Sequence, residues 1–412
     1  MSNQKYYQFR IPLCTPNLQG NEEKYVVDCI RSNWITSVGS YIERFEESVK
    51  DFTGTKYAVS LASGTAALHL ALQIVGVQAG DYVFVPNVTF VASCNAITYL
   101  GAEPILVDIC PETWQMNEQI IIKFLEENCI LKDNVCIHKP TGRRVSAIMP
   151  VHTLGNMCQM QAIMEISEKY NLIVVEDAAE ALGATQFQEN IRKIRHAGTY
   201  HSGTYHSGTY HSGTYQNGTI GHVGVLSFNG NKMITTGGGG MLLTDNEVFA
   251  QKARHLSRQA KTGIFEYSHN EIGYNYPLLN ILAAVGLAQM EQLDTFLVRK
   301  KEIDTFYREK FKDNKNIDFQ VVRENTKANN WLFTAIFEEK EKIIKILTDK
   351  KIQVRPFWQP MNQQVMFKNN IYLKISDNDF SNEIYQKTLS LPCGTQITQE
   401  NLQEIADLIN EI

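Results

Sequence analysis

Lys232 is the residue whose surroundings most clearly suggest covalent chemistry. It lies in the segment "GVLSFNGNKMITTGGGGMLLT", between two predicted strands and just before the glycines 237–240. Burial of a lysine favours its neutral amine, which is the form that attacks carbonyl carbons to make Schiff bases. A solvated surface lysine is the usual alternative, but the many small residues here indicate a backbone that packs closely around a ligand. We therefore predict that Lys232 is a Schiff-base lysine.

A second motif could hold a phosphate group. In "ASGTAALHLAL" a strand ends, Ser63-Gly64-Thr65 turns, and a helix begins. Backbone N–H groups at a helix N-terminus bind anions, and glycine lets the backbone approach them closely. The same residues would also suit an ordinary N-capped helix, because serine and threonine are common caps. The motif by itself leaves both interpretations open.

An acid completes the set of candidate groups. The segment "NLIVVEDAAEALGA" is predicted to deliver Asp177 at the carboxyl end of a strand, where open α/β sheets bind their ligands. A carboxylate in that position can pair with a protonated ring nitrogen. The alternative is that Asp177 only caps a helix.

These motifs lie on alternating strands and helices. Between residues 55 and 245, short β-rich runs such as "DYVFVP", "PILVDI" and "NLIVVED" alternate with helical patterns such as "GTAALHLALQIVG". Strands that are apolar on both faces predict an α/β fold with a mostly parallel sheet covered by helices. We assign this fold, with an N-terminal arm, to a large domain over residues 1–285, and a smaller α+β domain to residues 286–412.

Composition narrows the class of protein. The chain has 412 residues, 43% of them hydrophobic, and a net charge of −5, which argues against a nucleic-acid partner. Its eight cysteines include no CxxC pair, and scattered thiols are typical of a reducing cytosol. The first residues show no apolar signal-peptide region, and no apolar run approaches the roughly 20 residues that span a bilayer. We predict a cytoplasmic protein with no membrane partner.

The segment 196–220 repeats one pentapeptide, because "HAGTYHSGTYHSGTYHSGTY" is followed by the looser copy "QNGTI". Its histidines recur every five residues, at His196, His201, His206 and His211. That spacing turns successive side chains by about 140° on a helix and alternates them between the faces of a strand, so neither element brings them together. Glycine in every unit makes the segment costly to order. We predict an elongated, mobile surface loop that binds no metal.

The order of the three motifs points to a known family. A phosphate cradle, an acid about 110 residues later and a lysine about 55 residues after that are typical of pyridoxal-phosphate (PLP) enzymes of fold type I. Along nearly its whole length the sequence resembles the DegT/DnrJ/EryC1/StrS family of sugar aminotransferases. The matching segments include "NWITSVGSYIERFEESVKDFTGTKYAV", "VPNVTFVASCNAITYLGAEPILVD", "SFNGNKMITTGGGGM" and "EIGYNYPLLNILAAVGLAQMEQL".

Other segments are most similar to the LegC-type branch of that family, namely "IPLCTPNLQGNE", "TGRRVSAIMPVHTLGN" and "VRPFW". Members of this branch aminate C4 of nucleotide-linked 4-keto-6-deoxy sugars for legionaminic-acid-like and related bacterial surface sugars. The resemblance therefore implies PLP as the cofactor and a nucleotide sugar as the substrate.

The resemblance also implies a role for each matching residue. Lys232 would form the Schiff base with PLP and then move a proton between the substrate carbon and the cofactor. Asp177 would pair with the pyridinium nitrogen and keep the ring an electron sink. Gly64, Thr65 and the Ser227 hydroxyl would bind the cofactor phosphate.

Four further residues each have a second interpretation. Phe90 would stack on the pyridine ring, or be an ordinary core aromatic. Glu180, one predicted helical turn after Asp177, would reach the phenolic oxygen of the cofactor, or be an acid on a helix surface. Asn275 in "GYNYP" matches an asparagine that crosses to the partner's phosphate, which implies a homodimer with shared active sites. Arg355 would contact the diphosphate of the sugar nucleotide, or form a surface salt bridge.

The sequence departs from the family pattern at His222, where an acid is usual, at Pro277, where an arginine is common, and in the pentapeptide array. The resemblance implies transfer of an amino group from an amino acid, with glutamate expected, to a nucleotide-linked 4-keto-6-deoxyhexose, expected to be 2-acetamido-substituted. Two alternatives remain at this point. One is a PLP- or PMP-dependent sugar dehydratase, in which histidine replaces the lysine, and the other is a catalytically silent sensor or scaffold.

Overall fold

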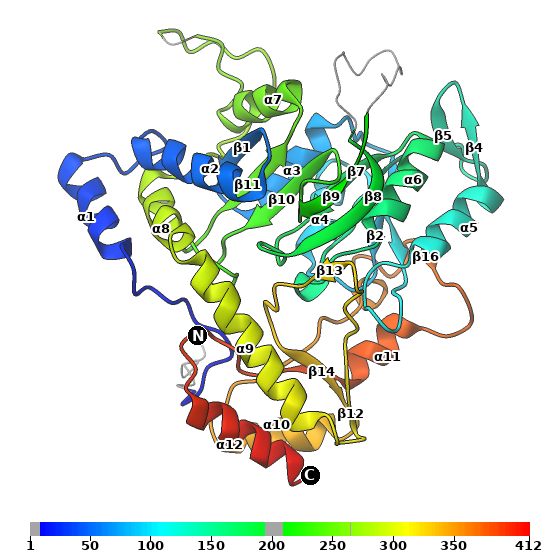
Figure 1. The fold of residues 1–412 in the computed structure, drawn as a ribbon. Helices are drawn as coiled ribbons and strands as arrows, with labels where there is room; N and C mark the ends of the chain where they lie inside the picture. The colour runs from blue at the N-terminus through cyan, green and yellow to red at the C-terminus, as the bar shows by residue number, and fades with distance from the viewer. Residues whose placement is uncertain (1–8, 194–208, 264) are drawn as a thin grey trace.

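The largest feature of the computed structural model, which describes residues 9–193, 209–263 and 265–412, is an eight-stranded sheet (Figure 1). Its order is β1-β11-β10-β7-β6-β2-β3-β16. Neighbouring strands from β10 to β16 run parallel, and β11 is antiparallel to both β1 and β10. The predicted mostly parallel sheet is therefore confirmed. The strands are β1 (Tyr57–Leu61), β2 (Tyr82–Pro86), β3 (Glu103–Val107), β6 (Val145–Ile148), β7 (Ile173–Asp177), β10 (Val223–Ser227), β11 (Gly240–Thr244) and β16 (Tyr372–Leu373).

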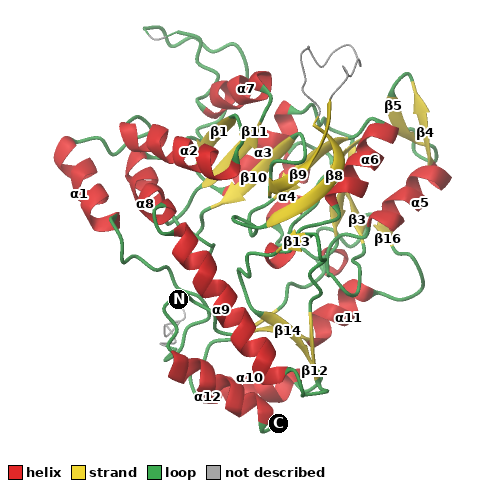
Figure 2. Ribbon diagram, in the orientation of Figure 1, coloured by secondary structure: helices red, strands yellow, loops and turns green. Residues whose placement is uncertain are grey.

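Helices cover both faces of this sheet because its strands are buried on both sides (Figure 2). Along β2, Val83 packs into one core and Phe84 into the other, as the pleat of a strand requires. The core that contains Phe84 is completed by α2 (Ser40–Thr53), α5 (Glu118–Asn128), α6 (Met160–Tyr170) and α8 (Asn280–Met290). The core that contains Val83 is completed by α3 (Gly64–Ile74), α4 (Ala92–Tyr99) and α7 (Glu247–Ser257). Helix α1 (Glu22–Ser32) packs against α8.

The C-terminal part of the chain builds a separate core. Helix α9 (Leu293–Phe311) leaves α8 at a bend of 60° and packs with α12. A four-stranded antiparallel sheet in the order β12-β14-β17-β15 contributes to the same core, which Ile11 of the N-terminal segment also joins. The elements are β12 (Ile317–Phe319), β14 (Thr334–Phe337), α10 (Lys340–Asp349), β15 (Arg355–Pro356), α11 (Phe380–Lys387), β17 (Thr388–Ser390) and α12 (Gln399–Asn410).

The predicted domain boundary between residues 285 and 286 falls inside α8. Strand β16 belongs to the C-terminal part of the chain, yet it pairs with β3 at the edge of the large sheet, which the sequence did not predict. The division into two domains remains a prediction.

A hairpin occupies part of the segment expected to be a loop. Strand β8 (Thr185–Lys193) pairs antiparallel with β9 (Thr209–Gln216), and β13 (Thr326–Lys327) adds a third strand beside β8. The loop predicted over residues 196–220 is therefore wrong for the residues of β9. Threonine and tyrosine favour strands, and β8 offers β9 a long edge to pair with, so a contact distant in sequence decides the structure there.

The absence of a metal site in the array stays a prediction. His196, His201 and His206 lie in 194–208, outside the described residues. Elsewhere, the residues that the structure describes include no cluster of three or more potential metal ligands. The remaining described elements are the hairpin β4 (Cys129–Lys132) and β5 (Val135–His138) and the short 3₁₀ helices η1 (Thr153–Gly155) and η2 (Met361–Gln363).

No single helix in the described part of the chain is long and apolar enough to cross a membrane. Helices α8 and α9 pass that test only when they are taken together across their 60° bend, and then by length and composition alone.

Candidate active site

Two adjacent parallel strands bring the predicted acid and a predicted phosphate ligand to one edge of the large sheet. Asp177 is the last residue of β7 and Ser227 is the last residue of β10, and Val225 of β10 is paired with Asp177. The carboxyl ends of parallel strands meet at the same edge, which is where open α/β folds bind ligands. Asp177 and Ser227 therefore lie where a ligand would be expected.

Asp177 is buried, and its carboxylate accepts two hydrogen bonds. Ser93 Oγ donates to Oδ2 at 2.7 Å, and the Ala179 N–H donates to Oδ1 at 3.2 Å. Burial raises the pKa of Asp177, while these two hydrogen bonds and the charge of Lys232 act in the opposite direction. Residues 178–184 form turns and no helix, so the alternative that Asp177 caps a helix is wrong.

Lys232 approaches the same edge from the loop that follows β10. Its Nζ lies 3.4 Å from Glu180 Oε1, in an ion pair whose side chains are only 13% and 4% exposed. Burial raises the pKa of Glu180, and the charge of Lys232 opposes that rise. The alternatives of a solvated surface lysine and of an acid on a helix surface are therefore both wrong. The helical turn predicted between Asp177 and Glu180 is also absent, because this segment is held in turns.

The indole ring of Trp331 covers one side of the Lys232 amine, a contact that the sequence did not reveal. Lys232 Nζ lies 4.0 Å from the centroid of the Trp331 ring, which is within the range of a cation–π interaction. The indole Nε1–H donates a hydrogen bond to the carbonyl of Asn231 at 2.6 Å. The ring is thus fixed against the lysine and against the backbone that carries it.

The predicted phosphate cradle has the close approach that requires glycine. A Cβ on Gly64 would lie 2.8 Å from Ser227 Cβ and 3.0 Å from its Oγ, closer than real contacts allow. Ser63 caps α3, since its Oγ accepts a hydrogen bond from the Ala66 N–H at 3.1 Å. The N–H groups of Gly64 and Thr65 belong to the first turn, where a helix offers no acceptor of its own. The motif is therefore an N-capped helix whose first donors are available to an anion beside the Ser227 hydroxyl.

Phe90 follows β2 and is 56% exposed, so it is not a core aromatic. Its carbonyl accepts a hydrogen bond from the Ser93 N–H at 3.2 Å, and Ser93 is the residue that bonds Asp177. The backbone of Phe90 is thereby tied to the acid. Stacking of its ring on a cofactor stays a prediction.

Asn275 is exposed on a loop that runs beside the phosphate cradle. The carbonyl of Tyr276 accepts a hydrogen bond from the Ala62 N–H at 2.7 Å, just before the cradle begins. Tyr274 and Tyr276 stack with their ring centroids 4.8 Å apart, which stiffens the loop on both sides of Asn275. An outward-facing asparagine is compatible with a contact across a subunit interface.

Arg355 lies in β15 and is exposed. It forms no ion pair with a carboxylate of the described residues, so the surface salt bridge expected as its alternative is not found there. Trp358, three residues later, stacks on Trp331 with the ring centroids 6.5 Å apart. This stacking connects the strand that carries Arg355 to the wall of the lysine site.

A strained backbone segment holds Glu180 in place. Leu154 has a left-handed φ of 60°, and its N–H donates a hydrogen bond to Glu180 Oε2 at 2.9 Å. Gly155 follows with φ 79°, and a Cβ there would collide with the side chain of Asn329. Asn329 Nδ2 in turn donates to the carbonyls of Glu180 and Leu182 at 2.8 and 2.9 Å. A strained turn that is held by such contacts is typical of a preorganised site.

Two of the three departures from the family pattern are accommodated by packing. His222 is buried, and its Nδ1 accepts a hydrogen bond from the Val174 N–H at 3.0 Å. Pro277 forms a bridge with Leu61 at the end of β1. Neither residue takes the place of a group at the site.

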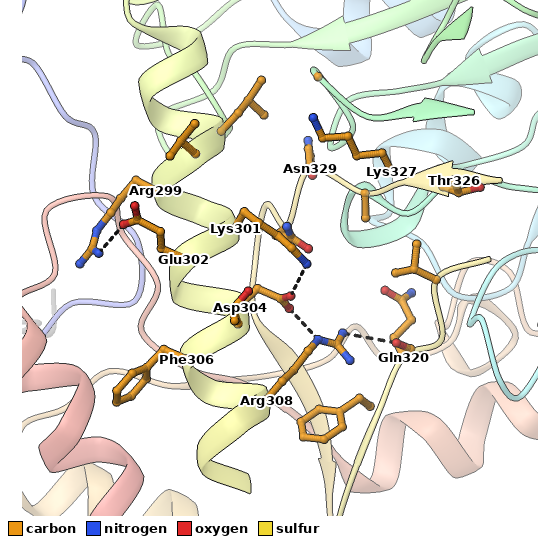
Figure 3. A pocket seen from close by; sticks show the side chains of 18 of the residues that line it. Arg299, Lys301, Glu302, Asp304, Phe306, Arg308, Gln320, Thr326, Lys327 and Asn329 are labelled. Carbon is orange, nitrogen blue, oxygen red and sulfur yellow. Dashed lines mark hydrogen bonds and ion pairs between the residues drawn. The ribbon is translucent and has the colours of Figure 1, made fainter. Parts of the chain in front are cut away.

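A separate cavity of about 1460 Å³ lies between α9 and the segment 318–330 (Figure 3). Its lining includes Asn329, so it adjoins the backbone that holds Glu180, although Lys232 and Asp177 do not line it. On α9, Asp304 pairs with Lys301 at 3.4 Å and with Arg308 at 2.9 Å, as Figure 3 shows. These charges satisfy one another, so we place the chemistry at the Lys232 edge and not in this cavity.

Sequence reasoning missed the residues that join the site from far along the chain. Trp331 and Asn329 come from the C-terminal part, for which the sequence predicted only a small α+β domain. Ser93 lies near Phe90, but nothing in the local pattern indicated that its hydroxyl bonds Asp177. The contact of Leu154 with Glu180 could not be predicted, because it is made by the backbone N–H, which every residue except proline carries.

Comparison with known proteins gives one family and many relatives. Residues 16–410 match the model of the DegT/DnrJ/EryC1/StrS aminotransferase family. The chain is 36% identical to GDP-perosamine synthase of Escherichia coli O157:H7 over 97% of its own length and 98% of the relative's. It is 33% identical to EpsN of Bacillus subtilis, a pyridoxal phosphate-dependent aminotransferase by its name, over 97% of this chain and 95% of that one.

Solved structures with the same fold include an aminotransferase from Brucella abortus, with a TM-score of 0.80, 22% identity and 95% of each chain covered. PseC of Helicobacter pylori has a TM-score of 0.80 and 21% identity, with 97% of this chain and 98% of that chain covered. PseC is described as an aminotransferase involved in the biosynthesis of pseudoaminic acid. At these identities the likeness establishes the fold.

Proposed function

The chain belongs to the DegT/DnrJ/EryC1/StrS aminotransferase family, and from that premise we propose that it moves an amino group from glutamate to C4 of a nucleotide-linked 4-keto-6-deoxyhexose with a 2-acetamido group. It is a PLP-dependent sugar aminotransferase. The finer proposal adds the carbon that is aminated, the donor and the LegC-type branch, which makes legionaminic-acid-like surface sugars. We place this reaction in the cytoplasm.

The names of relatives support the position and the donor. One relative is a dTDP-4-amino-4,6-dideoxy-D-glucose transaminase, a name that specifies an amino group at C4 and no oxygen at C6. Another is a UDP-4-amino-4-deoxy-L-arabinose–oxoglutarate aminotransferase, and oxoglutarate is the keto acid that remains when glutamate gives up its amino group. Transfer of the same chemistry to this chain is our proposal.

The residues at the Lys232 edge fit the cofactor. A phosphate would meet the first N–H groups of α3 and the Ser227 hydroxyl, where a Cβ on Gly64 would block the approach. Asp177 offers a buried carboxylate to a protonated ring nitrogen, and Lys232 offers an amine within the same group of charges. Bound PLP supplies an aldehyde carbon and an electron-accepting ring, on which an amino group can pass from one substrate to another.

We assign the proton transfers to Lys232. Its Nζ is held by Glu180 on one side and by the face of Trp331 on the other. As a free base it can take a proton from the substrate carbon that carries nitrogen and return one. The indole covers Nζ and leaves the lysine side chain only 13% exposed, and reduced contact with water strengthens the electrostatic interactions inside the site.

We assign to Asp177 the task of holding a positive charge on the ring nitrogen. Burial alone raises its pKa, so the ionised form depends on the donors around it, Ser93 Oγ and the Ala179 N–H. Phe90 lies on the same backbone segment as Ser93 and is proposed to stack on the ring. Arg355 is proposed to contact the diphosphate of the substrate, because guanidinium groups bind phosphate oxygens in a bidentate way.

We propose a homodimer whose active sites are shared. Phe265, Tyr267 and Ile272, on the loop before Asn275, are 96%, 92% and 84% exposed. Large apolar side chains grouped in one exposed segment typically mark an interaction surface. A partner that covers this loop would bring Asn275 to the partner's phosphate cradle.

The cluster of Lys232, Glu180 and Asp177 at the carboxyl edge of the sheet is the observation that carries the proposal. It is tested with the PLP-loaded protein, ¹⁵N-labelled glutamate and a panel of UDP-, GDP- and CMP-linked 4-keto-6-deoxy sugars. We expect mass spectrometry to find ¹⁵N in one of the sugars. Lys232→Ala should abolish this transfer and the visible absorbance of the lysine-linked cofactor, whereas Lys327→Ala, at an exposed lysine, should change neither. PLP binding without label in any sugar would refute the proposed substrate class.

A further inference from the structure

Lys300 of α9 is a buried lysine that has sulfur atoms where a carboxylate would be expected. Its Nζ donates hydrogen bonds to the carbonyls of Trp331 at 2.7 Å and Cys393 at 2.8 Å. Cys14 Sγ lies 3.5 Å from Nζ, and Cys393 Sγ lies 3.9 Å away. No carboxylate of the described residues forms an ion pair with Lys300, although a buried ammonium ordinarily requires a negative partner.

The two cysteines are neighbours because their backbones run side by side. The Cys393 N–H donates a hydrogen bond to the carbonyl of Leu13 at 2.8 Å. A Cβ on Gly394 would lie 3.5 Å from Cys14 Cα. Both thiols converge on one nitrogen atom, and both are free in the structure. Cys14 is partly exposed and Cys393 is buried.

Cys14 and Cys393 both lie beside the Lys300 ammonium, but they differ in their exposure and therefore in their expected reactivity. A neighbouring lysine cation favours a thiolate, which is the form of cysteine that reacts with oxidants. Burial alone would lower the pKa of Lys300, but its two sulfur neighbours outweigh that effect and raise it, so the lysine stays charged. Burial raises the pKa of Cys393, and Lys300 opposes that rise only in part. Cys14 is therefore the more accessible of the two sulfur atoms beside the Lys300 ammonium.

The geometry points to a reversible oxidation site, at which a peroxide converts Cys14 and Cys393 into a disulfide. In the first step the Cys14 thiolate attacks one oxygen of the peroxide, the O–O bond breaks, and the sulfur becomes a sulfenic acid while hydroxide leaves. In the second step Cys393 sulfur attacks Cys14 sulfur, the S–O bond breaks, and water leaves with the thiol proton. Two electrons pass from the two thiols to the peroxide, and a cellular dithiol would reverse the change.

This site adjoins the active site through two short connections. Cys14 Sγ lies 4.0 Å from the carbonyl of Asn231, the residue before Lys232. Lys300 holds the carbonyl of Trp331, whose ring covers Lys232. A disulfide would change the position of the Cys14 sulfur relative to both the Asn231 carbonyl and the Lys300 ammonium. We therefore expect oxidation to lower the amination rate, although the chemical test below does not depend on activity.

Peptide mapping of the PLP-loaded protein tests the site. The protein is treated with hydrogen peroxide, remaining thiols are alkylated, and cross-linked peptides are identified by mass spectrometry. Cys110 is a matched control, since it is also partly exposed but its sulfur faces the Glu112 carboxylate at 2.9 Å. We expect Cys14 to be lost at least about tenfold faster than Cys110, and to reappear as a Cys14–Cys393 disulfide that dithiothreitol reverses.

Two variants separate the roles of sulfur and cation. Cys14→Ser should prevent the disulfide and keep the activity of the reduced enzyme. Lys300→Gln should keep donors for the carbonyls of Trp331 and Cys393 but slow the loss of Cys14 about tenfold, because the positive charge is gone. If Lys300→Gln does not fold, the inference is still tested by the ratio of the oxidation rates of Cys14 and Cys110 in the parent protein. Equal oxidation of the two thiols, or a Cys14 product joined to anything other than Cys393, would overturn the inference.

Discussion

The indole of Trp331 lies against the amine of Lys232, with 4.0 Å between Nζ and the ring centroid, although the two residues are far apart in the sequence. The same ring donates a hydrogen bond to Asn231 and stacks on Trp358. Trp331 therefore connects the loop of the reactive lysine to the C-terminal part that carries Arg355. It is one of the residues that join the two parts of the proposed site.

The first prediction concerns this ring. Trp331→Leu removes the aromatic face and the N–H donor and exposes Lys232 to water, so the amination rate constant kcat should fall about tenfold. Trp331→Phe keeps a ring without the donor, and its loss should be smaller. The measurement is steady-state amination of the sugar identified in the labelling screen. Equal rates for the leucine variant and the parent would show that the ring has no part in the reaction.

The second prediction concerns Asp177 and pH. Asp177→Asn cannot balance a positive ring nitrogen, so the amination rate should fall at least about 100-fold. In the PLP-free protein the same change should increase stability at neutral pH. Because burial raises the pKa of Asp177 in the folded protein, the parent loses stability as the pH rises from the unfolded value of 3.8 through the folded value.

The Asp177→Asn variant has no such group. Its melting temperature should therefore exceed that of the parent protein at pH 8, and should exceed it by less near pH 4. An advantage that stays constant across this range would mean that the pKa of Asp177 is not raised by folding. Protein that is merely damaged by the substitution would lose stability at both pH values.

The third prediction concerns assembly. If Asn275 serves the partner's site, Lys232→Ala and Asn275→Ala chains should complement each other. A mixed dimer has one site with both defects and one site with neither, so activity should partly recover when the two inactive proteins are mixed and allowed to exchange subunits. Sedimentation of the mixture identifies the dimer. Full activity in a monomeric fraction would contradict shared sites.

The fourth prediction concerns the pentapeptide array. Lys193 of β8 is paired with Thr209 of β9, so deletion of residues 199–208 removes two repeats and leaves both strands. Residues 194–198 then connect the strands, a length common in hairpins. We expect unchanged folding and amination at least as fast as in the parent, and no effect of chelators on either protein. Loss of activity after this deletion, or inactivation on removal of co-purified zinc, would show that the histidines have a function.

A longer deletion should behave differently. Removing residues 198–217 would leave a single repeat, but it deletes β9 together with Asn217, whose N–H donates a hydrogen bond to the carbonyl of Ala184 at 3.0 Å. The residues that follow are anchored to Glu176, which accepts hydrogen bonds from the N–H groups of Gly218 at 3.0 Å and Ile220 at 2.7 Å. Without β9, the residues from Gly218 onward are no longer joined to β8 by a paired strand. We expect this loss to lower the melting temperature. An unchanged melting temperature would show that β9 is dispensable.

The sequence by itself determined the large sheet and the order of the chemical groups. The strand "YVFVP" has no charged residue and is buried throughout. A strand buried on both faces requires helices on both sides, so local pattern is enough to predict the layers. The sequence also predicted three chemical groups at one edge of the sheet, namely Lys232, Asp177 and the Gly64 motif. Each lies at or just after the end of a strand, and the carboxyl ends of parallel strands meet at the same edge. These features depend on periodicity and chain order, which are properties of the sequence alone.

Only the tertiary structure decided which other side chains meet those groups. It showed that Glu180 is buried against Lys232 and not on a helix, that residues of the array pair with β8, that Trp331 covers the lysine, and that Lys300 lies between two cysteines. Each of these contacts joins residues whose separation is set by the packing of whole elements. Local propensity carries no information about such distances, because the free energy that selects them comes from burial and hydrogen bonding across the assembled fold.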